Sequence, residues 1–275
     1  MRQARLSDLL DLITASGHVT VADVTARLQV SAATVRRDLN TLAEQKLVLR
    51  THGGASAFTS GYELPLQART TMHAEAKAAI ARATSDLIAV GDVVGLNGGT
   101  TTTEVAWQLA RTDRLTPADG SRGFTLVTNA LNIAYELTVR PHVRVVLSGG
   151  TVRPRSYEMV GPTARRSIEE LVLDVAVLGV DGVGPRFGVT TADPEEAEVG
   201  RALAAAAERV VVVADASKLS STGPTRLLAL AGVDVLVTDE APGRLLQESL
   251  DRAEVTVVVA GRQVPPARTP VTGHR

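Results

Sequence analysis

The sequence contains no cysteine in its 275 residues, and this absence removes several classes of chemistry. Disulfide bonds, thiol catalysis and cysteine-ligated zinc or iron–sulfur sites are all excluded. The chain also lacks an apolar run long enough to span a bilayer, and its start shows no basic segment followed by an apolar one. We therefore expect a cytoplasmic protein that makes no contact with a membrane.

An excess of charge of one sign is also missing, because the net charge is only −1, which by itself argues against a nucleic-acid partner. The two parts of the chain differ, however. Residues 1–57 hold seven basic residues against five acidic ones, and the remainder holds 22 basic and 25 acidic residues. Residues 1–57 thus carry a net charge of +2 and the rest of the chain carries −3. This difference is compatible with an N-terminal DNA-binding domain but does not establish one.

The length and the apolar content together predict two folded domains. The chain has 275 residues, of which 44% are hydrophobic, so it is far too apolar for a disordered protein. Residues 1–57 show the periodicity of three short helices, and the first of them is expected to stop at Gly17. Thr20 and Asp23 have the spacing of a capping box at the start of the second helix.

The third helix, expected over residues 31–44, begins with Ser31 as its cap and reads "SAATVRRDLN". Val35, Leu39 and Leu42 recur at helical spacing and must face the core. The other faces carry small residues, which allow close approach to base edges, and arginines, which can fork onto guanine or clamp a phosphate. A solvated surface helix is the alternative interpretation. The candidate DNA contacts on this helix are Ser31, Ala33, Thr34, Arg36, Arg37 and Asn40.

The segment after this helix has the pattern of a β-wing. Residues 47–49 are expected to form a strand, and Gly53 and Gly54 form a turn. Arg50 and His52 then stand where a wing would meet the DNA backbone or the minor groove, so both are candidate DNA contacts. The alternative is an irregular loop with no such role.

Residues 17–55 resemble the winged helix-turn-helix of the DeoR family of bacterial transcriptional regulators. The resemblance rests on "VS..TVRRDL..L" together with the ending "R.HGGA". It implies a protein that binds double-stranded operator DNA. It also implies a repressor, or less often an activator, of sugar or nucleoside catabolic genes.

The boundaries of the second domain follow from composition. Residues 58–73 have few periodic apolar positions and contain Gly61 and Pro65, so we expect a linker there. A clear helical pattern starts at residue 74. The tail 262–275 is rich in proline and is expected to be disordered. The sequence thus predicts a winged helix-turn-helix over 1–57, a linker over 58–73 and a second domain over 74–261.

From residue 92 onward, seven apolar runs rich in β-branched residues follow one another, and each ends in Gly, Thr, Asn or Asp. Continuous rather than alternating hydrophobicity indicates strands that are covered on both faces, as in a mainly parallel α/β sheet. In such sheets ligands bind outside the carboxyl ends of the strands. The polar residues of this domain gather at those positions.

Gly98, Gly99, Thr100 and Thr101 form the turn with the most evident chemistry. A strand end, two glycines and a helix start together offer unpaired N–H groups, hydroxyls and a positive dipole end, which suit a phosphate. The spacing of a P-loop is absent, so an NTPase is not expected. A tight turn between a strand and a helix, without a ligand, explains the glycines equally well.

Further polar residues stand at the ends of other predicted strands, and each has a structural explanation as a cap, a turn or a surface residue. Together, two carboxylates, an amine and several hydroxyls match a phosphorylated sugar. Lys77, on the helix that precedes the first strand, either adds a cation or covers that helix. The candidate effector ligands are Lys77, Asn97, Gly98, Gly99, Thr100, Thr101, Thr102, Thr128, Asn129, Gly149, Gly150, Asp181, Gly182, Asp215 and Lys218.

Residues 74–260 resemble the C-terminal sensor domain of the DeoR family through "GGTTTTEVA", "LVTNALNIA", "LSGGTV", "LGVDGV", "DASK" and "VTD". That domain is similar in fold to ribose-5-phosphate isomerase and glucosamine-6-phosphate deaminase. The resemblance implies a phosphorylated sugar as effector. We expect no metal and no cofactor. Asn97 is a departure, because many family members carry an acid before the glycines.

Three functions remain open at this point. A ligand-responsive transcription factor is the first, and an aldose–ketose phosphate isomerase with an appended DNA-binding domain is the second, with Asp181 as its general base. A constitutive architectural DNA binder is the third. One recognition helix contacts too few bases for genomic specificity, so we also expect a homodimer or a higher homo-oligomer.

Overall fold

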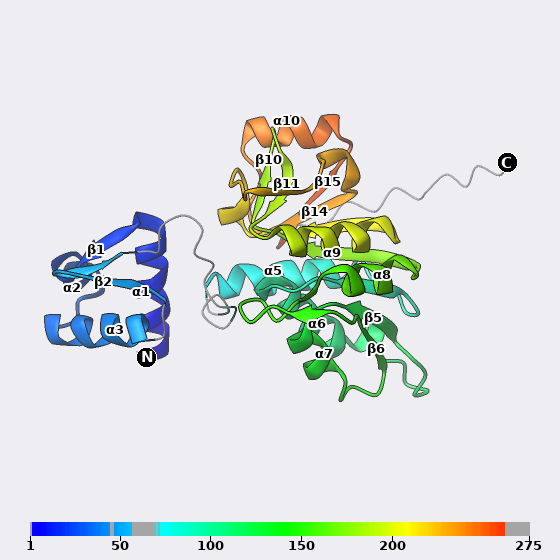
Figure 1. The fold of residues 1–275 in the computed structure, drawn as a ribbon, viewed down its shortest axis with the longest axis horizontal. Helices are drawn as coiled ribbons and strands as arrows, with labels where there is room; N and C mark the ends of the chain where they lie inside the picture. Colours follow the sequence, from blue (N-terminus) through cyan, green and yellow to red (C-terminus); the bar gives the residue numbers. More distant parts are fainter. Residues whose placement is uncertain (1, 45–46, 57–65, 67–69, 71, 262–275) are drawn as a thin grey trace. The chain divides into compact units, whose positions relative to one another are not determined.

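The computed structural model describes residues 2–44, 47–56, 66, 70 and 72–261. The chain separates into two compact units (Figure 1): Met1–Ala74 with Val152–Glu158, and Glu75–Thr151 with Met159–Arg275. Most of the linker expected over 58–73 and all of the tail expected over 262–275 lie outside the described residues. Among the described residues, no helix combines the length and the apolar character that crossing a membrane requires.

The N-terminal unit is a three-helix domain with a small antiparallel sheet, whose strand order is β1-β3-β2. Its buried core includes Leu9, Ile13, Val24 and Leu39. The capping box is present, because the Thr20 hydroxyl accepts from the Asp23 N–H and the Asp23 side chain accepts from the Thr20 N–H. The elements are α1 (Arg2–Ser16), β1 (His18–Thr20), α2 (Val21–Leu28), α3 (Ala32–Glu44), β2 (Leu49–Thr51) and β3 (Gly54–Ser56).

The strand predicted over residues 47–49 is wrong in its position. β2 begins at Leu49, because Leu47 and Val48 are buried in the helical core instead of pairing with a strand. Strand β1 was not predicted at all. It pairs with β3, some 36 residues away in sequence, so local periodicity carries no signal for it.

An ion pair between a partly exposed arginine and a buried aspartate joins α1 to α3. The Nε of Arg5 lies 2.6 Å from Oδ2 of Asp38, and only 2% of the Asp38 side chain is exposed. The hydrogen bond to Asp38 raises the pKa of Arg5 above its ordinary value. Because this pair and the buried Val35 and Leu39 turn one side of α3 to the core, Arg36 and Arg37 must face outward.

The larger unit is built on a seven-stranded parallel sheet with the strand order β15-β14-β12-β9-β4-β5-β6. Each strand corresponds to one of the seven predicted apolar runs, so the predicted α/β class is confirmed. The strands are β4 (Val93–Leu96), β5 (Phe124–Thr128), β6 (Val143–Leu147), β9 (Leu173–Gly179), β12 (Ala207–Val213), β14 (Val235–Thr238) and β15 (Thr256–Val259).

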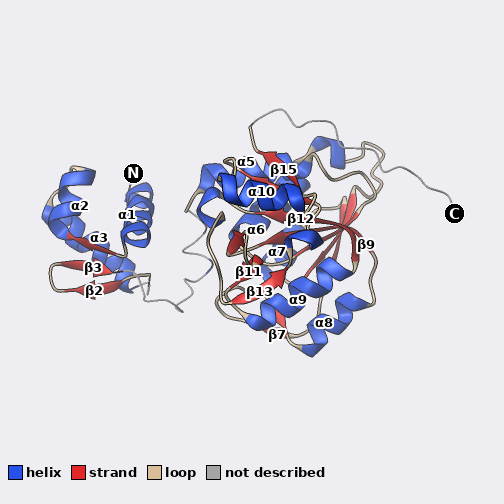
Figure 2. Ribbon diagram, turned by 90° about the horizontal axis from the view of Figure 1, so that it is seen from above, coloured by secondary structure: helices blue, strands red, loops and turns tan. Residues whose placement is uncertain are grey.

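Helices cover both faces of this sheet, as Figure 2 shows. One face packs on α5 (Ala74–Ser85), α6 (Thr100–Arg111) and α7 (Leu131–Leu137), and the other on α8 (Pro162–Glu169), α9 (Pro194–Ala205) and α10 (Arg244–Arg252). Successive side chains of a strand point to opposite faces of the sheet, so they pack alternately into the two hydrophobic cores, one on each face. On β12, Val211 and Val213 enter the first core, and Val210 and Val212 enter the second.

Short strands outside the main sheet were not predicted. An antiparallel sheet joins β10 (Gly182–Gly184), β11 (Gly188–Thr191) and β13 (Thr225–Leu228), and β7 (Thr151–Val152) pairs with β8 (Met159–Val160). These strands have two to four residues each, and β10 is mostly glycine. Runs this short show no hydrophobic period that a sequence reading could detect.

The two glycines of the wing provide a test of packing. A Cβ on Gly54 would lie 1.9 Å from the carbonyl oxygen of Val19, so β1 and β3 meet only because Gly54 has no side chain. We expect Gly54→Ala to destabilise the N-terminal unit by about 2–4 kcal/mol. Gly53 has a φ of +89° and no atom within 4 Å of an added Cβ. The control Gly53→Ala should therefore cost only about 1 kcal/mol of backbone strain. Thermal unfolding of both variants measures the difference, and equal losses would contradict this packing.

Candidate functional site

The outer face of α3 presents most of the predicted DNA contacts. Ser31, Ala33, Arg36, Arg37 and Asn40 are exposed. Ser31 directly precedes α3, and its hydroxyl accepts from the N–H of Thr34 at 3.2 Å, as expected of the predicted cap. Thr34 is half-buried, and its hydroxyl lies 2.9 Å from that of Ser31. The guanidinium groups of Arg36 and Arg37 form no hydrogen bond or ion pair with any described residue, so they are available to a ligand.

Arg50, another predicted DNA contact, forms hydrogen bonds within the protein. Its Nε donates to Oδ1 of Asn40 at 2.9 Å, and its Nη1 donates to the carbonyl oxygen of Gly54. Arg50 therefore joins the hairpin of β2 and β3 to α3, and the Asn40 side-chain oxygen accepts one of its hydrogen bonds. His52 is exposed in the turn between β2 and β3.

The strand order reverses between β4 and β9. From β4 the chain proceeds to β5 and β6 on one side, and from β9 it proceeds to β12, β14 and β15 on the other. Loops that leave such a switch point diverge and open a crevice at the carboxyl ends of the strands. Asn97–Thr102 follow β4 and Asp181 follows β9, so residues about 80 positions apart come to the same edge.

Asn97 connects the two sides of the switch point. Its Nδ2 donates to the carbonyl oxygen of Gly179 at 2.9 Å, and its Oδ1 accepts from the N–H of Gly179 at 2.8 Å. Its side chain is buried, and Thr102 packs against the same glycine. Asn97 thus acts first as a clamp between strand ends. No local pattern could predict this role, because Gly179 lies 82 residues away in the chain.

The start of α6 has the geometry of an anion site. Gly99, its N-cap, has a φ of +135°, a conformation that favours glycine. The first N–H groups of a helix have no acceptor inside that helix, and the dipole adds positive charge there. The hydroxyls of Thr102 and Thr103 donate back to the Gly99 carbonyl, at 3.2 and 2.6 Å. Thr100 and Thr101 are half-exposed beside these N–H groups.

Asp181 and Lys218 face each other at the same edge. Nζ of Lys218 lies 3.9 Å from Oδ1 of Asp181, and about a third of each side chain is exposed, at 34% and 30%. The other carboxylate oxygen accepts from the Thr191 hydroxyl at 3.1 Å and from the Ala192 N–H at 2.9 Å. The carboxylate is therefore held in place, yet both charged groups remain accessible to a polar ligand.

Other predicted ligands have structural partners inside the protein. The Thr128 hydroxyl accepts from the Ala130 N–H at 3.0 Å, and Asn129 donates to the Met159 carbonyl at 3.1 Å. The carboxylate of Asp215 accepts from the Ser217 N–H at 3.0 Å and from the Ser217 hydroxyl. These bonds cap the turns that follow β5 and β12. Lys77 is buried on α5.

The remaining predicted glycines allow close backbone packing. A Cβ on Gly150 would lie 2.7 Å from the Val160 carbonyl oxygen, and one on Gly182 would lie 2.4 Å from that of Ser221. Gly149 has more room, since the nearest atom is a methyl carbon of Thr163 at 3.1 Å. Gly98 is buried and follows Asn97, the first residue after β4. Gly150 and Gly182 are therefore required by packing, whether or not a ligand binds.

Three polar residues of this region were not singled out from the sequence. The hydroxyls of Ser148 and Thr238 and Oδ1 of Asn132 are buried and have no hydrogen-bond partner in the described structure. Ser148 follows β6, Thr238 ends β14, and Asn132 lies in the first turn of α7 and donates to the Thr103 hydroxyl at 3.0 Å. Buried polar atoms seldom lack a hydrogen-bond partner, so these three groups are unusual.

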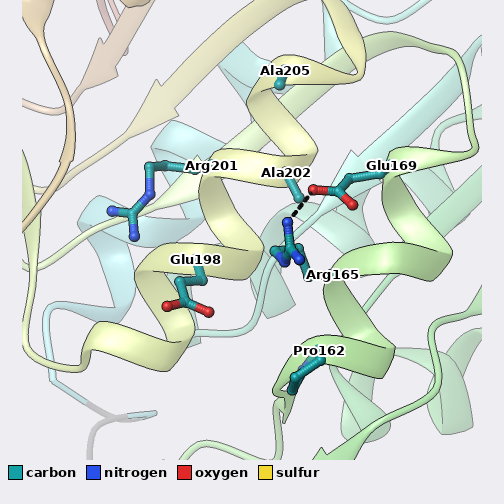
Figure 3. A pocket seen from close by; sticks show the side chains of 7 residues that line it. All are labelled: Pro162, Arg165, Glu169, Glu198, Arg201, Ala202 and Ala205. Carbon is teal, nitrogen blue, oxygen red and sulfur yellow. Dashed lines mark hydrogen bonds and ion pairs between the residues drawn. The ribbon is translucent and has the colours of Figure 1, made fainter.

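A separate hollow of about 510 Å³ lies between α8 and α9 (Figure 3). An ion pair of 2.7 Å between Arg165 and Glu169 crosses part of it. It contains none of the predicted effector ligands. Its lining residues are Pro162, Arg165, Glu169, Glu198, Arg201, Ala202 and Ala205. Within the described ranges, no group of three His, Asp or Glu side chains is placed to hold a metal ion.

Comparison with solved structures aligns the chain with ribose 5-phosphate isomerase A from Methanocaldococcus jannaschii. The TM-score is 0.37 at 18% identity, with coverage of 52% of this chain and 53% of that one. A second alignment, with the isomerase A from Neisseria gonorrhoeae, also has a TM-score of 0.37 at 18% identity, covering 53% of each chain.

Sequence comparisons cover nearly the whole chain. The HTH-type transcriptional regulator GlpR of Haloferax volcanii is 35% identical over 251 residues, which are 91% of this chain and 94% of that protein. The glycerol-3-phosphate regulon repressor of Escherichia coli is 32% identical over 238 residues, which are 86% and 91%. The family models described as DeoR-like helix-turn-helix domain and DeoR C terminal sensor domain match residues 5–61 and 72–240. The chain therefore belongs to the DeoR family, as the resemblance in its sequence predicted.

Proposed function

We propose that this protein is a transcriptional repressor that binds operator DNA through α3, and that a phosphorylated sugar at the strand ends of its sheet changes its operator affinity. The proposal of an effector site rests on one observation: three features lie together at the switch point of the sheet. These are the open N-terminus of α6, the Asn97 clamp and the accessible Asp181–Lys218 pair. The names of the relatives, several of which are repressors, support the DNA-binding half.

In the DNA-binding half, α3 enters the major groove. Its first turn offers only small side chains, so the backbone can approach the bases closely. Arg36 and Arg37 then reach base edges or phosphates, because neither is occupied within the described protein. Arg50 acts indirectly, since it holds the wing and Asn40 in place.

In the effector half, the phosphate binds the backbone N–H groups of Gly98–Thr101 and the hydroxyls of Thr100 and Thr101. Lys218 adds positive charge, and Asp181 accepts from sugar hydroxyls. An isomerase would use the same carboxylate as a general base, so turnover must be measured together with binding.

The DNA contacts are tested by single substitutions on α3. Arg36→Ala or Arg37→Ala should lower operator affinity about tenfold to a hundredfold, because one base or phosphate contact is worth roughly 1–3 kcal/mol. Loss of a base contact should relax specificity at one base pair. Loss of a phosphate contact should weaken all sequences alike and reduce the salt dependence. Quantitative binding to operator and random duplexes at several salt concentrations separates these outcomes.

The control for this experiment is Arg166→Ala, which removes an exposed arginine from α8 in the other unit. We expect this variant to bind operator as the wild type does. Wild-type affinity in both α3 variants at every salt concentration would show that α3 is not the recognition helix.

The effector site is tested by Gly99→Val. A β-branched residue cannot readily adopt the φ of +135°, and its side chain would crowd Thr102, from which an added Cβ lies 3.3 Å. We expect at least a tenfold loss of effector affinity and unchanged operator binding without effector. Calorimetry with a panel of pentose and hexose phosphates and glycerol 3-phosphate measures binding, and a turnover assay on the same panel detects an enzyme.

Gly91→Val is the matched control, because Gly91 also has a positive φ, of +94°, but lies before β4 rather than after it. It should suffer similar backbone strain and keep effector affinity. If the wild type binds none of these compounds, or if Gly99→Val binds them as tightly as the wild type, the proposed site is wrong.

A further inference from the structure

The seven-stranded sheet has an open edge at β6. This strand pairs with β5 in an unbroken parallel register and with no other described strand. Its sequence, "VRVVL", contains no proline, and Arg144 is its only charged residue. An edge strand presents a row of N–H and C=O groups that can pair with another strand, and proteins usually protect such edges with proline, bulges or several charges. β6 has little of this protection.

Apolar side chains accompany this edge. Leu131, Tyr135 and Val139 recur every four residues along α7 and just past its end, and they are 40%, 78% and 77% exposed. Leu147, the last residue of β6, is 37% exposed. We call these four residues the α7–β6 face. In Figure 1, α7 and β6 lie together at the end of the larger unit opposite α10.

The concentration of apolar residues there is uneven. Ten large hydrophobic side chains among the described residues are exposed, and four of them belong to the α7–β6 face. The opposite end of the sheet, formed by β14, α10 and β15, exposes one such side chain within the described residues, Leu245. Single exposed apolar residues are ordinary, but a row along an unpaired strand indicates a surface that another molecule covers.

The charges beside this face are of both signs. Glu136 and Arg140 on or next to α7 and Arg144 on β6 are exposed, and none of them forms an ion pair with a described residue. A surface with one sign of charge would repel its own copy. A surface that carries both an acid and bases can pair with itself across a twofold axis, because the acid of each copy can then face a base of the other.

We propose that a second copy of this chain covers the α7–β6 face. A twofold axis perpendicular to the sheet makes β6 antiparallel to its copy, so that the two sheets become continuous. A register centred on Val145 places Val143 opposite Leu147 and uses the open backbone groups of both edges. The same axis keeps both α7 helices on one side of the joined sheet, where Tyr135 and Val139 become buried.

This interface needs neither DNA nor effector, so it goes beyond the proposed function and can be tested without it. If the proposed function also holds, the dimer supplies two α3 helices for two operator half-sites. A different protein would have to present both a strand that pairs with β6 and an apolar surface that packs on the exposed residues of α7. A second copy provides both elements by symmetry.

The test is the association of the full chain in the absence of DNA. We expect the wild type to be dimeric at micromolar concentration in light scattering and sedimentation. Tyr135→Glu should raise the dimer dissociation constant at least tenfold, because it places a charge in the apolar row. The control Val172→Glu changes a residue that is also 78% exposed, but lies just before β9, and should associate like the wild type.

Circular dichroism and the unfolding temperature show whether each variant is folded, and because Tyr135 is largely exposed we expect no change. A second measurement uses the absence of cysteine from the chain. Arg144→Cys should be cross-linked to its own copy by a short bismaleimide, whereas Val172→Cys should not. A monomeric wild type, a dimer that is insensitive to Tyr135→Glu, or equal cross-linking of both cysteine variants would overturn the proposal.

Discussion

The two hydrogen bonds between Asn97 and Gly179 are the interaction on which the candidate effector site depends. They fix the end of β4 against the end of β9, at the point where the chain turns away in opposite directions. Because Thr102 packs on Gly179, the same clamp also sets the position of the first turn of α6. The open N–H groups of α6 and the carboxylate of Asp181 can then address one ligand. An aspartate at position 97 would lack the amide N–H that donates to Gly179.

The fold could be predicted where its signals are local. Seven continuous apolar runs indicated seven strands covered on both faces, and the Thr20–Asp23 capping box marked the start of α2. The prediction failed where pairing is between distant segments. β1 has meaning only through β3, and the strand expected over residues 47–49 moved because Leu47 and Val48 are needed in the helical core. Neither the pairing of β1 nor the position of β2 can be predicted from the local periodicity of apolar residues.

For the candidate site, the sequence predicted positions better than roles. Residues after parallel strands must lie at one edge, so Asn97, Thr128, Asp181 and Asp215 were placed correctly relative to the strands. Which of them is free to bind depends on contacts that a pattern does not show. Thr128 and Asp215 cap their own turns, and Arg50 braces Asn40. Ser148 and Thr238 were overlooked, because only the folded structure reveals that a hydroxyl is buried without a partner.

A ligand can change operator affinity only by as much as it distinguishes between two arrangements of the protein, typically 1–3 kcal/mol. The contacts at the strand ends suggest which element responds. Thr103, in the first turn of α6, accepts from Asn132 in the first turn of α7. The helix that would hold the phosphate is therefore bonded to the helix that carries the proposed dimer face. A small shift at Gly99 would reach α7 through this bond, and in a symmetric dimer it would act on both copies together.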